Sequence, residues 1–334
     1  MRHLIALLLG CLLLATAGAA DPKLRIGTLA PKNSLYYQQL IELGEAWRSA
    51  QGGNARYMVY PDGGQGGEAE MVRRMRIGQL QGALLSVVGL REIERSIAAL
   101  QSMPLMFRSW EEVDYVREQI RPAMEQKFLE KDFVVLAWGD AGWVRFFSKD
   151  PAFAPGDYIG MKFFAWGGEF EQQEIMKSLG YTPVPLETAD VLPAIQTGMI
   201  NAVPSTPYFA LASQIYRNAP NMLDLNWAPI VGALVVTRSA WEQMSPEGQA
   251  ALRASGLAVG ERIRAQARKE VDGAVEAMVK RGLVVNEPDP DQRKAWQALA
   301  AELYPRIRGT LVPAETFDEV LAHLEAYRAG HKAN

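Results

Sequence analysis

The feature of this chain that most limits its fold is a repeated alternation of short apolar runs with segments of helical periodicity. Runs typical of buried strands cover residues 24–28, 55–60 and 81–88. The segment after Ser34 carries apolar residues at helical spacing, and a further helix is indicated over 68–77. Strands separated by helices are typical of parallel sheets. We therefore predict an α/β lobe with a mainly parallel sheet.

The same alternation returns in the second half of the chain. Helices are predicted over 169–178 and 189–197, and strands over 181–186 and 200–203. This pattern indicates a second α/β lobe. We expect the chain to leave the first lobe near Gly142–Arg145.

A long helical tract follows the second lobe. Ser245 and Pro246 form a favourable helix start, and the helical pattern continues to about Arg281. At ~1.5 Å per residue such a helix would be on the order of 50 Å long, which is more than one lobe needs. We expect bends at its glycines, Gly256, Gly260 and Gly273. The apolar run 230–237 just before the tract is expected to cross between the lobes.

These features predict a leader segment followed by two discontinuous lobes. The expected division is 1–19 for a signal peptide, 20–143 plus 231–270 for lobe 1, and 144–230 plus 271–334 for lobe 2.

The N-terminus has the features of a secretory signal peptide. A short basic region precedes an apolar run over 4–14, and Ala17-Gly18-Ala19 matches a cleavage site. The only cysteine, Cys11, lies in this segment. The residues before Cys11 loosely resemble a lipoprotein box, but the apolar run continues past it, so we do not expect lipid anchoring. No later stretch is long and apolar enough to span a bilayer. We predict a soluble periplasmic protein.

Charge and motif content argue against several classes of function. A net charge of −3 offers no basic surface for nucleic acid. Beyond the leader, the chain has no cysteine, and its histidines are His323 and His331. The glycine-rich segment 61–67 lacks the ending of a phosphate loop and is interpreted as a turn. We expect no enzyme activity, cofactor or metal, although chemistry by a carboxylate pair stays open from these residues.

Arg145 lies inside an apolar, aromatic run, 144–147. A guanidinium stays protonated, and it is costly to bury without an anionic partner. Arg145 therefore either pairs with an acidic residue of the protein or receives an anion from outside. The acidic residues considered as internal partners are Asp140, Asp157 and Glu169.

Five segments in order carry a resemblance to a known family. They are LRIGTLAP at 24–31, YPDGGQGGEAEMVRRMRIGQL at 60–80, IGMKFF at 159–164, LGYTPVPLETADVLPAIQTGMINAV at 179–203 and WEQMSPEGQAAL at 241–252. Over about 24–327 the chain resembles the substrate-binding proteins of tripartite ATP-independent periplasmic (TRAP) transporters, of the C4-dicarboxylate-binding type.

This resemblance implies a two-lobe periplasmic binding protein fold, type II-like, with hinge strands and a long helix spanning both lobes. It implies that a ligand closes the lobes and is then delivered to the small and large membrane subunits of an ion-driven permease. It also implies that the protein catalyses no reaction. The alternatives are a ligand sensor for a membrane kinase and the binding protein of an ATP-driven importer, which shares the two-lobe plan.

The resemblance also places the ligand site, and this chain departs from the family there. The arginine that pairs a ligand carboxylate in family members corresponds to Phe164. A secondary arginine corresponds to Arg145, and an asparagine before a proline corresponds to Thr206, or to Ser205 with a shift of one residue. The predicted ligand-binding residues are Arg145, Phe164, Trp166, Trp143, Ser205, Thr206, Tyr208 and Trp227.

The loss of one clamp and the gain of rings favour a larger, more apolar ligand than a C4-dicarboxylate. Our hypothesis is a monocarboxylate or amphipathic organic acid, held by Arg145 at one end and by aromatic rings at the other. A neutral, lipid-like ligand is the rival. A branch of the family with hydrophobic ligands works with an accessory periplasmic helical-repeat protein, which we keep as an alternative partner.

Overall fold

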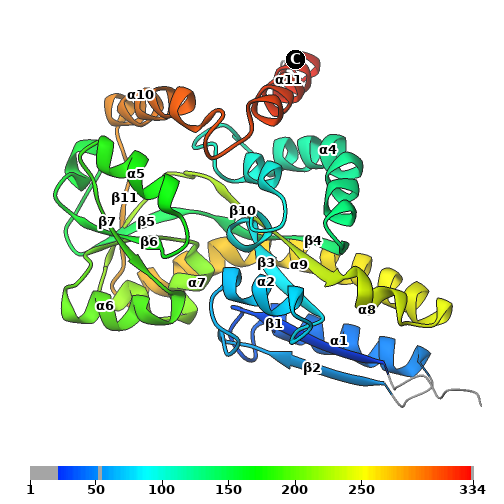
Figure 1. Ribbon diagram of the computed structural model, residues 1–334. Helices are drawn as coiled ribbons and strands as arrows, with labels where there is room; N and C mark the ends of the chain where they lie inside the picture. The colour runs from blue at the N-terminus through cyan, green and yellow to red at the C-terminus, as the bar shows by residue number, and fades with distance from the viewer. Residues whose placement is uncertain (1–21, 52–54, 332–334) are drawn as a thin grey trace, which may run out of the picture.

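The structure of the protein is a computed structural model that describes residues 22–51 and 55–331 (Figure 1). The expected signal peptide and Cys11 lie outside the described residues. The described chain forms two sheets with helices packed around them, which confirms the predicted α/β class and its two-lobe plan.

The first sheet has five strands. In spatial order they are β2 (Arg56–Tyr60), β1 (Lys23–Thr28), β3 (Gly82–Ser86), β10 (Pro229–Thr237) and β4 (Phe133–Trp143). β1 is parallel to both β2 and β3, as expected, whereas β10 is antiparallel to both β3 and β4. All of β10 is paired within this sheet, so the run 230–237 is not the segment that crosses between the sheets.

The second sheet has six strands. In spatial order they are β11 (Val284–Asn286), β9 (Asn221–Leu223), β5 (Arg145–Ser148), β8 (Ala202–Ser205), β6 (Lys162–Trp166) and β7 (Thr182–Leu186). β6 is parallel to β7 and β8, and β5 is antiparallel to β8 and β9.

The chain changes sheet at Val144, since β4 ends at Trp143 and β5 begins at Arg145. It returns just before β10. The two crossing segments bond to each other: the Val144 N–H donates to the Ala228 carbonyl at 2.8 Å, and the Trp227 N–H donates to the Val144 carbonyl at 3.0 Å. The predicted boundary near Gly142–Arg145 coincides with this change of sheet, while the full division into lobes stays a prediction.

The long helix α9 (Pro246–Val279) runs unbroken for 34 residues, as the sequence predicts. Ser245 caps it by accepting a hydrogen bond from the Gly248 N–H. Along most of its length α9 packs on β4 and on α1 (Leu35–Ala50), and near its end Met278 joins the core of the second sheet (Figure 1). One rigid element therefore contacts both halves.

Two of the three α9 glycines at which bends were expected, Gly256 and Gly260, instead provide close packing. A β-carbon on Gly256 would lie 2.8 Å from the Leu136 carbonyl oxygen, and one on Gly260 would lie 2.6 Å from the Trp138 carbonyl oxygen. Both distances are shorter than real β-carbon contacts, so only glycine lets the helix approach β4 this closely.

The remaining elements follow the two halves of the chain. Those in the first-sheet portion are α2 (Glu68–Arg76), α3 (Val87–Leu90), η1 (Arg95–Leu100), α4 (Trp110–Glu130) and α8 (Arg238–Glu242). Those in the second-sheet portion are η2 (Pro155–Tyr158), α5 (Phe170–Ser178), η3 (Thr188–Asp190), α6 (Val191–Thr197), α7 (Pro207–Ala212) and η4 (Ile215–Arg217). The C-terminal helices are α10 (Pro290–Ile307) and α11 (Ala314–Gly330).

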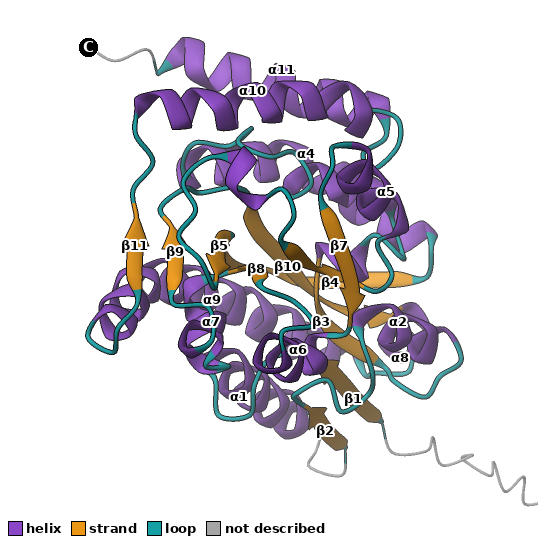
Figure 2. Ribbon diagram, turned by 90° about the vertical axis from the view of Figure 1, so that its left-hand side faces the viewer, coloured by secondary structure: helices purple, strands orange, loops and turns teal. Residues whose placement is uncertain are grey.

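The C-terminal helices lie at the same end of the molecule, at the top of both views (Figures 1 and 2). Trp296 of α10 packs with Phe146 of the second sheet, their rings stacked at 5.4 Å. α11 instead places Phe317 and Leu324 in the core that contains α4. The two C-terminal helices thus pack on different cores, while the expected assignment of 271–334 to lobe 2 stays a prediction.

Within the residues that the structure describes, no helix combines the length and the apolar character that crossing a bilayer requires.

Candidate functional site

A cavity of about 180 Å³ lies between the two sheets. Thr28 and Ser86, the last residues of β1 and β3, line it from the first sheet. Trp166 and Ser205, the last residues of β6 and β8, line it from the second. Ligands of open α/β sheets bind outside the carboxyl ends of the strands, so this cavity is the candidate site.

Aromatic rings form much of the lining: Tyr36, Phe164, Trp166, Tyr208 and Phe209. Phe164 and Trp166 meet edge to face at 4.8 Å on the second sheet. Tyr36 of α1 meets Tyr208 of α7 edge to face at 5.9 Å, so a ring pair joins the first half to the second at the cavity.

Among the described residues, two carboxylates line the cavity. The first, Glu68, is hydrogen-bonded to backbone N–H groups and to a hydroxyl of the protein. It accepts hydrogen bonds from the Ser86 N–H at 2.8 Å, the Ser86 hydroxyl at 2.7 Å and the Gly89 N–H at 2.8 Å. Burial raises the pKa of Glu68, although these three hydrogen bonds act in the opposite direction.

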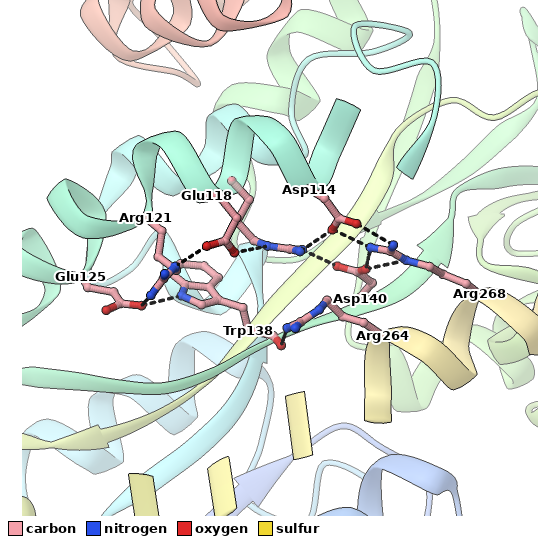
Figure 3. Close-up of polar contacts among 9 residues, drawn as sticks. Asp114, Glu118, Arg121, Glu125, Trp138, Asp140, Arg264 and Arg268 are labelled. Carbon is pink, nitrogen blue, oxygen red and sulfur yellow. Dashed lines mark hydrogen bonds and ion pairs between the residues drawn. The ribbon is translucent and has the colours of Figure 1, made fainter. Parts of the chain in front are cut away.

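The second carboxylate, Asp140, is neutralised by arginines (Figure 3). Its Oδ1 lies 3.0 Å from Nη1 of Arg117, and its Oδ2 lies 2.6 Å from Nη2 of Arg268. Asp114 completes the cluster with two 2.7 Å bonds to Arg268 and a bond to Arg117. The Asp140 side chain has no exposed surface, so its charge is compensated within the protein.

Among the described residues, the lining of the cavity includes no lysine, arginine or histidine. An anion entering it would lose its hydration without gaining a charged partner, which is strongly unfavourable.

Arg145 lies outside the lining of this cavity and forms an internal ion pair. Its Nη1 is 2.6 Å from Oδ1 of Asp224, in the segment after β9. This geometry agrees with the hypothesis that Arg145 pairs with an acidic residue of the protein. The partner, however, is none of the three acidic residues considered from the sequence. Asp157 accepts from the N–H groups of Phe153 and Ala154, and Glu169 pairs with Arg91.

Five of the predicted ligand-binding residues line the cavity: Phe164, Trp166, Ser205, Thr206 and Tyr208. The Thr206 hydroxyl also caps α7 by accepting from the Phe209 N–H at 3.3 Å. The structure places the other aromatics elsewhere. Trp143 packs on Trp110, with 4.9 Å between the ring centroids, in the core that contains α4. Trp227 lines a second cavity.

Several lining residues were not singled out as site residues from the sequence. They include Leu29, Tyr36, Glu68, Ser86 and Gln101. Tyr36 carried a helical-periodicity signal that indicated core packing. Ser86 lies near the carboxyl end of the predicted strand 81–88, and this position was the available signal.

Contacts across the rim join the two halves near the cavity. Arg91, after α3, lies 3.1 Å from Glu169 and 2.8 Å from Glu171, both close to the start of α5. Arg95 lies 2.7 Å from Glu171. Burial raises the pKa of Glu169, and Arg91 acts against this. In the described part of the chain, no cluster of three or more His, Cys, Asp or Glu residues could hold a metal ion.

Comparison with known proteins agrees with this architecture. Residues 26–309 match the family described as bacterial extracellular solute-binding protein, family 7 (DctP). The C4-dicarboxylate-binding periplasmic protein DctP of Rhodobacter capsulatus is 21% identical over 266 residues, covering 79% of this chain and 79% of that protein. An uncharacterized protein, YiiZ of Salmonella typhimurium, is 26% identical over 242 residues, covering 71% and 73%.

Solved structures share the fold. A TRAP periplasmic solute-binding protein from Chromohalobacter salexigens with bound D-glucuronate superposes with a TM-score of 0.81 at 20% identity, covering 91% of this chain and 99% of that one. One from Sulfurospirillum deleyianum with bound succinate has a TM-score of 0.81 at 17% identity, covering 91% and 98%.

Proposed function

Because the chain belongs to the bacterial extracellular solute-binding protein family 7, the receptors of TRAP transporters, we propose that it captures a neutral, mainly apolar organic solute between its sheets. The observation that carries this proposal is the lining of the cavity, which combines several aromatic rings with no cationic side chain among the described residues.

Energetic magnitudes favour this ligand class. Burying a carboxylate without a partner costs several kcal/mol, on the order of 3–5 kcal/mol for a broken buried pair. Removing an apolar group the size of a leucine side chain from water contributes roughly 1.5–3 kcal/mol. Phe164 stands where the resemblance implies a ligand-binding arginine, so this chain has exchanged a charge contact for a ring contact.

An organic acid is the second candidate. Its support is the binding of D-glucuronate and succinate by proteins of the same fold, and the retention of Arg145. The Nε of Arg145 is buried without a hydrogen-bond partner among the described residues. An acid would have to compete with Asp224 for this guanidinium.

We further infer that the solute is delivered in the periplasm to the small and large membrane subunits of a TRAP permease. The paired crossing segments at Val144 and Ala228 would act as the hinge, and the Arg91–Glu169 pair would hold the closed form. An accessory helical-repeat partner and a role as a sensor module stay as alternatives.

Native mass spectrometry of protein purified without refolding tests the ligand class. We expect a co-purified neutral molecule, bound equally by the wild type and by Arg145→Ala. An acid that co-purifies and is lost in Arg145→Ala would overturn the proposal.

Asp224→Ala is the matched variant, because it leaves the Arg145 guanidinium without its internal partner. If the solute is neutral, its affinity for Asp224→Ala stays within about twofold of wild type. A tenfold gain for organic acids in wild-type-like folded protein would support the second candidate instead.

A further inference from the structure

A second cavity of about 150 Å³ adjoins the first. It lies between the second sheet and the helices α5 and α10, and apolar side chains make up most of its lining: Val144, Phe146, Phe163, Ile175, Trp227 and Leu299 among them. Its carboxylate, Glu169, is already paired with Arg91. The solute site described above does not include this second cavity.

The two cavities share part of their walls. Gln101, Phe164, Trp166 and Pro204 line both. The edge-to-face pair of Phe164 and Trp166 therefore stands between the two spaces. A solute longer than the first cavity would meet this boundary.

The boundary carries an unpaired hydrogen-bonding group. The side-chain Oε1 of Gln101 is buried and has no hydrogen-bond partner among the described residues. Leaving a buried acceptor unpaired costs about 1–3 kcal/mol, so such a group calls for an explanation. A hydroxyl or amide N–H of a bound solute would satisfy it.

We propose that the second cavity is a subsite for an apolar arm of the solute, and that Gln101 accepts a hydrogen bond from a donor group at the junction. This inference rests on the proposed function. It specifies the solute as an elongated neutral molecule with a donor near its middle and an apolar arm on each side.

Symmetric secondary alcohols are the probes, from 4-heptanol to 7-tridecanol, with binding measured by titration calorimetry on the mature full chain. Each step adds one methylene to each arm. Because burying a methylene group contributes ~0.8 kcal/mol and each step adds two, we expect the affinity to rise about fifteenfold per step while both arms are accommodated.

Leu299→Trp fills the second cavity from α10. We expect it to remove the gain for the longer alcohols and to leave 4-heptanol within about twofold. Leu321→Trp is the matched control, since Leu321 is also half-buried on a C-terminal helix but lines neither cavity. It should bind the whole series as the wild type does.

Gln101→Met tests the junction, with the ketone of equal length as a probe that cannot donate. The wild type should prefer 5-nonanol to 5-nonanone at least fivefold, and the variant should show no preference. If no alcohol binds, the proposed function fails together with this inference. If the alcohols bind but neither Leu299→Trp nor Gln101→Met changes the pattern, the second subsite is wrong and the proposed function stands.

Discussion

The guanidinium of Arg145 lies 2.6 Å from the carboxylate of Asp224 and so ties the first residue of β5 to the segment that follows β9. Both residues lie next to the crossing segments, at Val144 and at Trp227–Ala228. The ion pair therefore lies beside two of the segments in which the chain passes between its sheets, while α9 makes a further connection, from β10 to β11.

Removing this pair should weaken the fold more than an exposed pair would. The Arg145 side chain is 15% exposed, so solvent screens it only in part. We expect Arg145→Ala to lower the free energy of unfolding by about 1–3 kcal/mol, measured by urea denaturation. Lys294→Ala, which breaks an exposed pair with Asp291, is the control and should change it by less than about 0.5 kcal/mol. Equal effects would contradict the structural role of Arg145.

Gly67 should tolerate a β-carbon in spite of a close neighbour from the opposite half. Its φ is −66°, which any residue adopts, and the β-carbon would overlap the carboxylate of Glu187, the far end of an exposed and flexible side chain. Because this carboxylate can turn away, we expect Gly67→Ala to keep solute affinity within about twofold of wild type, with little change in the free energy of unfolding. Binding is measured by calorimetry with the best probe alcohol.

Gly168→Ala is the matched control, because its β-carbon meets nothing within 4 Å. It should bind the solute as Gly67→Ala does. A loss of affinity confined to Gly67→Ala would show that the Glu187 side chain cannot move aside.

Glu68 should make stability depend on pH above the ordinary range for a glutamate. Because burial raises its pKa in the folded state above the usual 4.5, the folded protein binds the proton more tightly than the unfolded chain. This contribution is present at low pH and is lost as the pH rises through the folded pKa.

Glu68→Gln removes this titration. We expect the melting temperature of the variant, relative to that of the wild type, to rise as the pH increases from 4.5 upward. Only the slope is diagnostic, because the amide also changes the hydrogen bonds to Ser86 and Gly89. A difference that is independent of pH would refute the assignment.

Gly260 should be among the least replaceable residues of α9. A β-carbon there would press on the Trp138 carbonyl of β4, and neither backbone can move freely. We expect Gly260→Ala to destabilise the protein by about 1–3 kcal/mol in urea denaturation. Gly273→Ala in the same helix meets nothing within 4 Å and should stabilise it by up to about 1 kcal/mol.

Local patterns were sufficient to predict much of the fold. Periodicity located the alternating strands and helices, and Ser245-Pro246 marked the start of α9. Thr206 caps α7 and Pro207 is its first residue, which is a local signal for a helix start. These features depend on residues close together in the chain, where spacing and capping rules apply.

The remaining features of the fold and the site depend on contacts between segments that are far apart in the chain. Asp224 became the partner of Arg145 because β5 pairs with β9, and no local pattern states that pairing. α11 packs on α4 through its apolar face. The helical periodicity of that face does not say which half of the protein it contacts. No sequence pattern pointed to Gln101, because its proposed role rests on a buried Oε1 that has no hydrogen-bond partner in the described part of the chain.

The position of β10 bears on how the protein is made. This strand lies between β3 and β4, yet it is synthesised after nearly all of the second sheet. The first sheet therefore stays open until residue 237 has left the ribosome, and long-range pairing of this kind is slow. A chain that completes its first sheet so late should stay incompletely folded for most of its synthesis, because the strand that joins β3 to β4 has not yet been made.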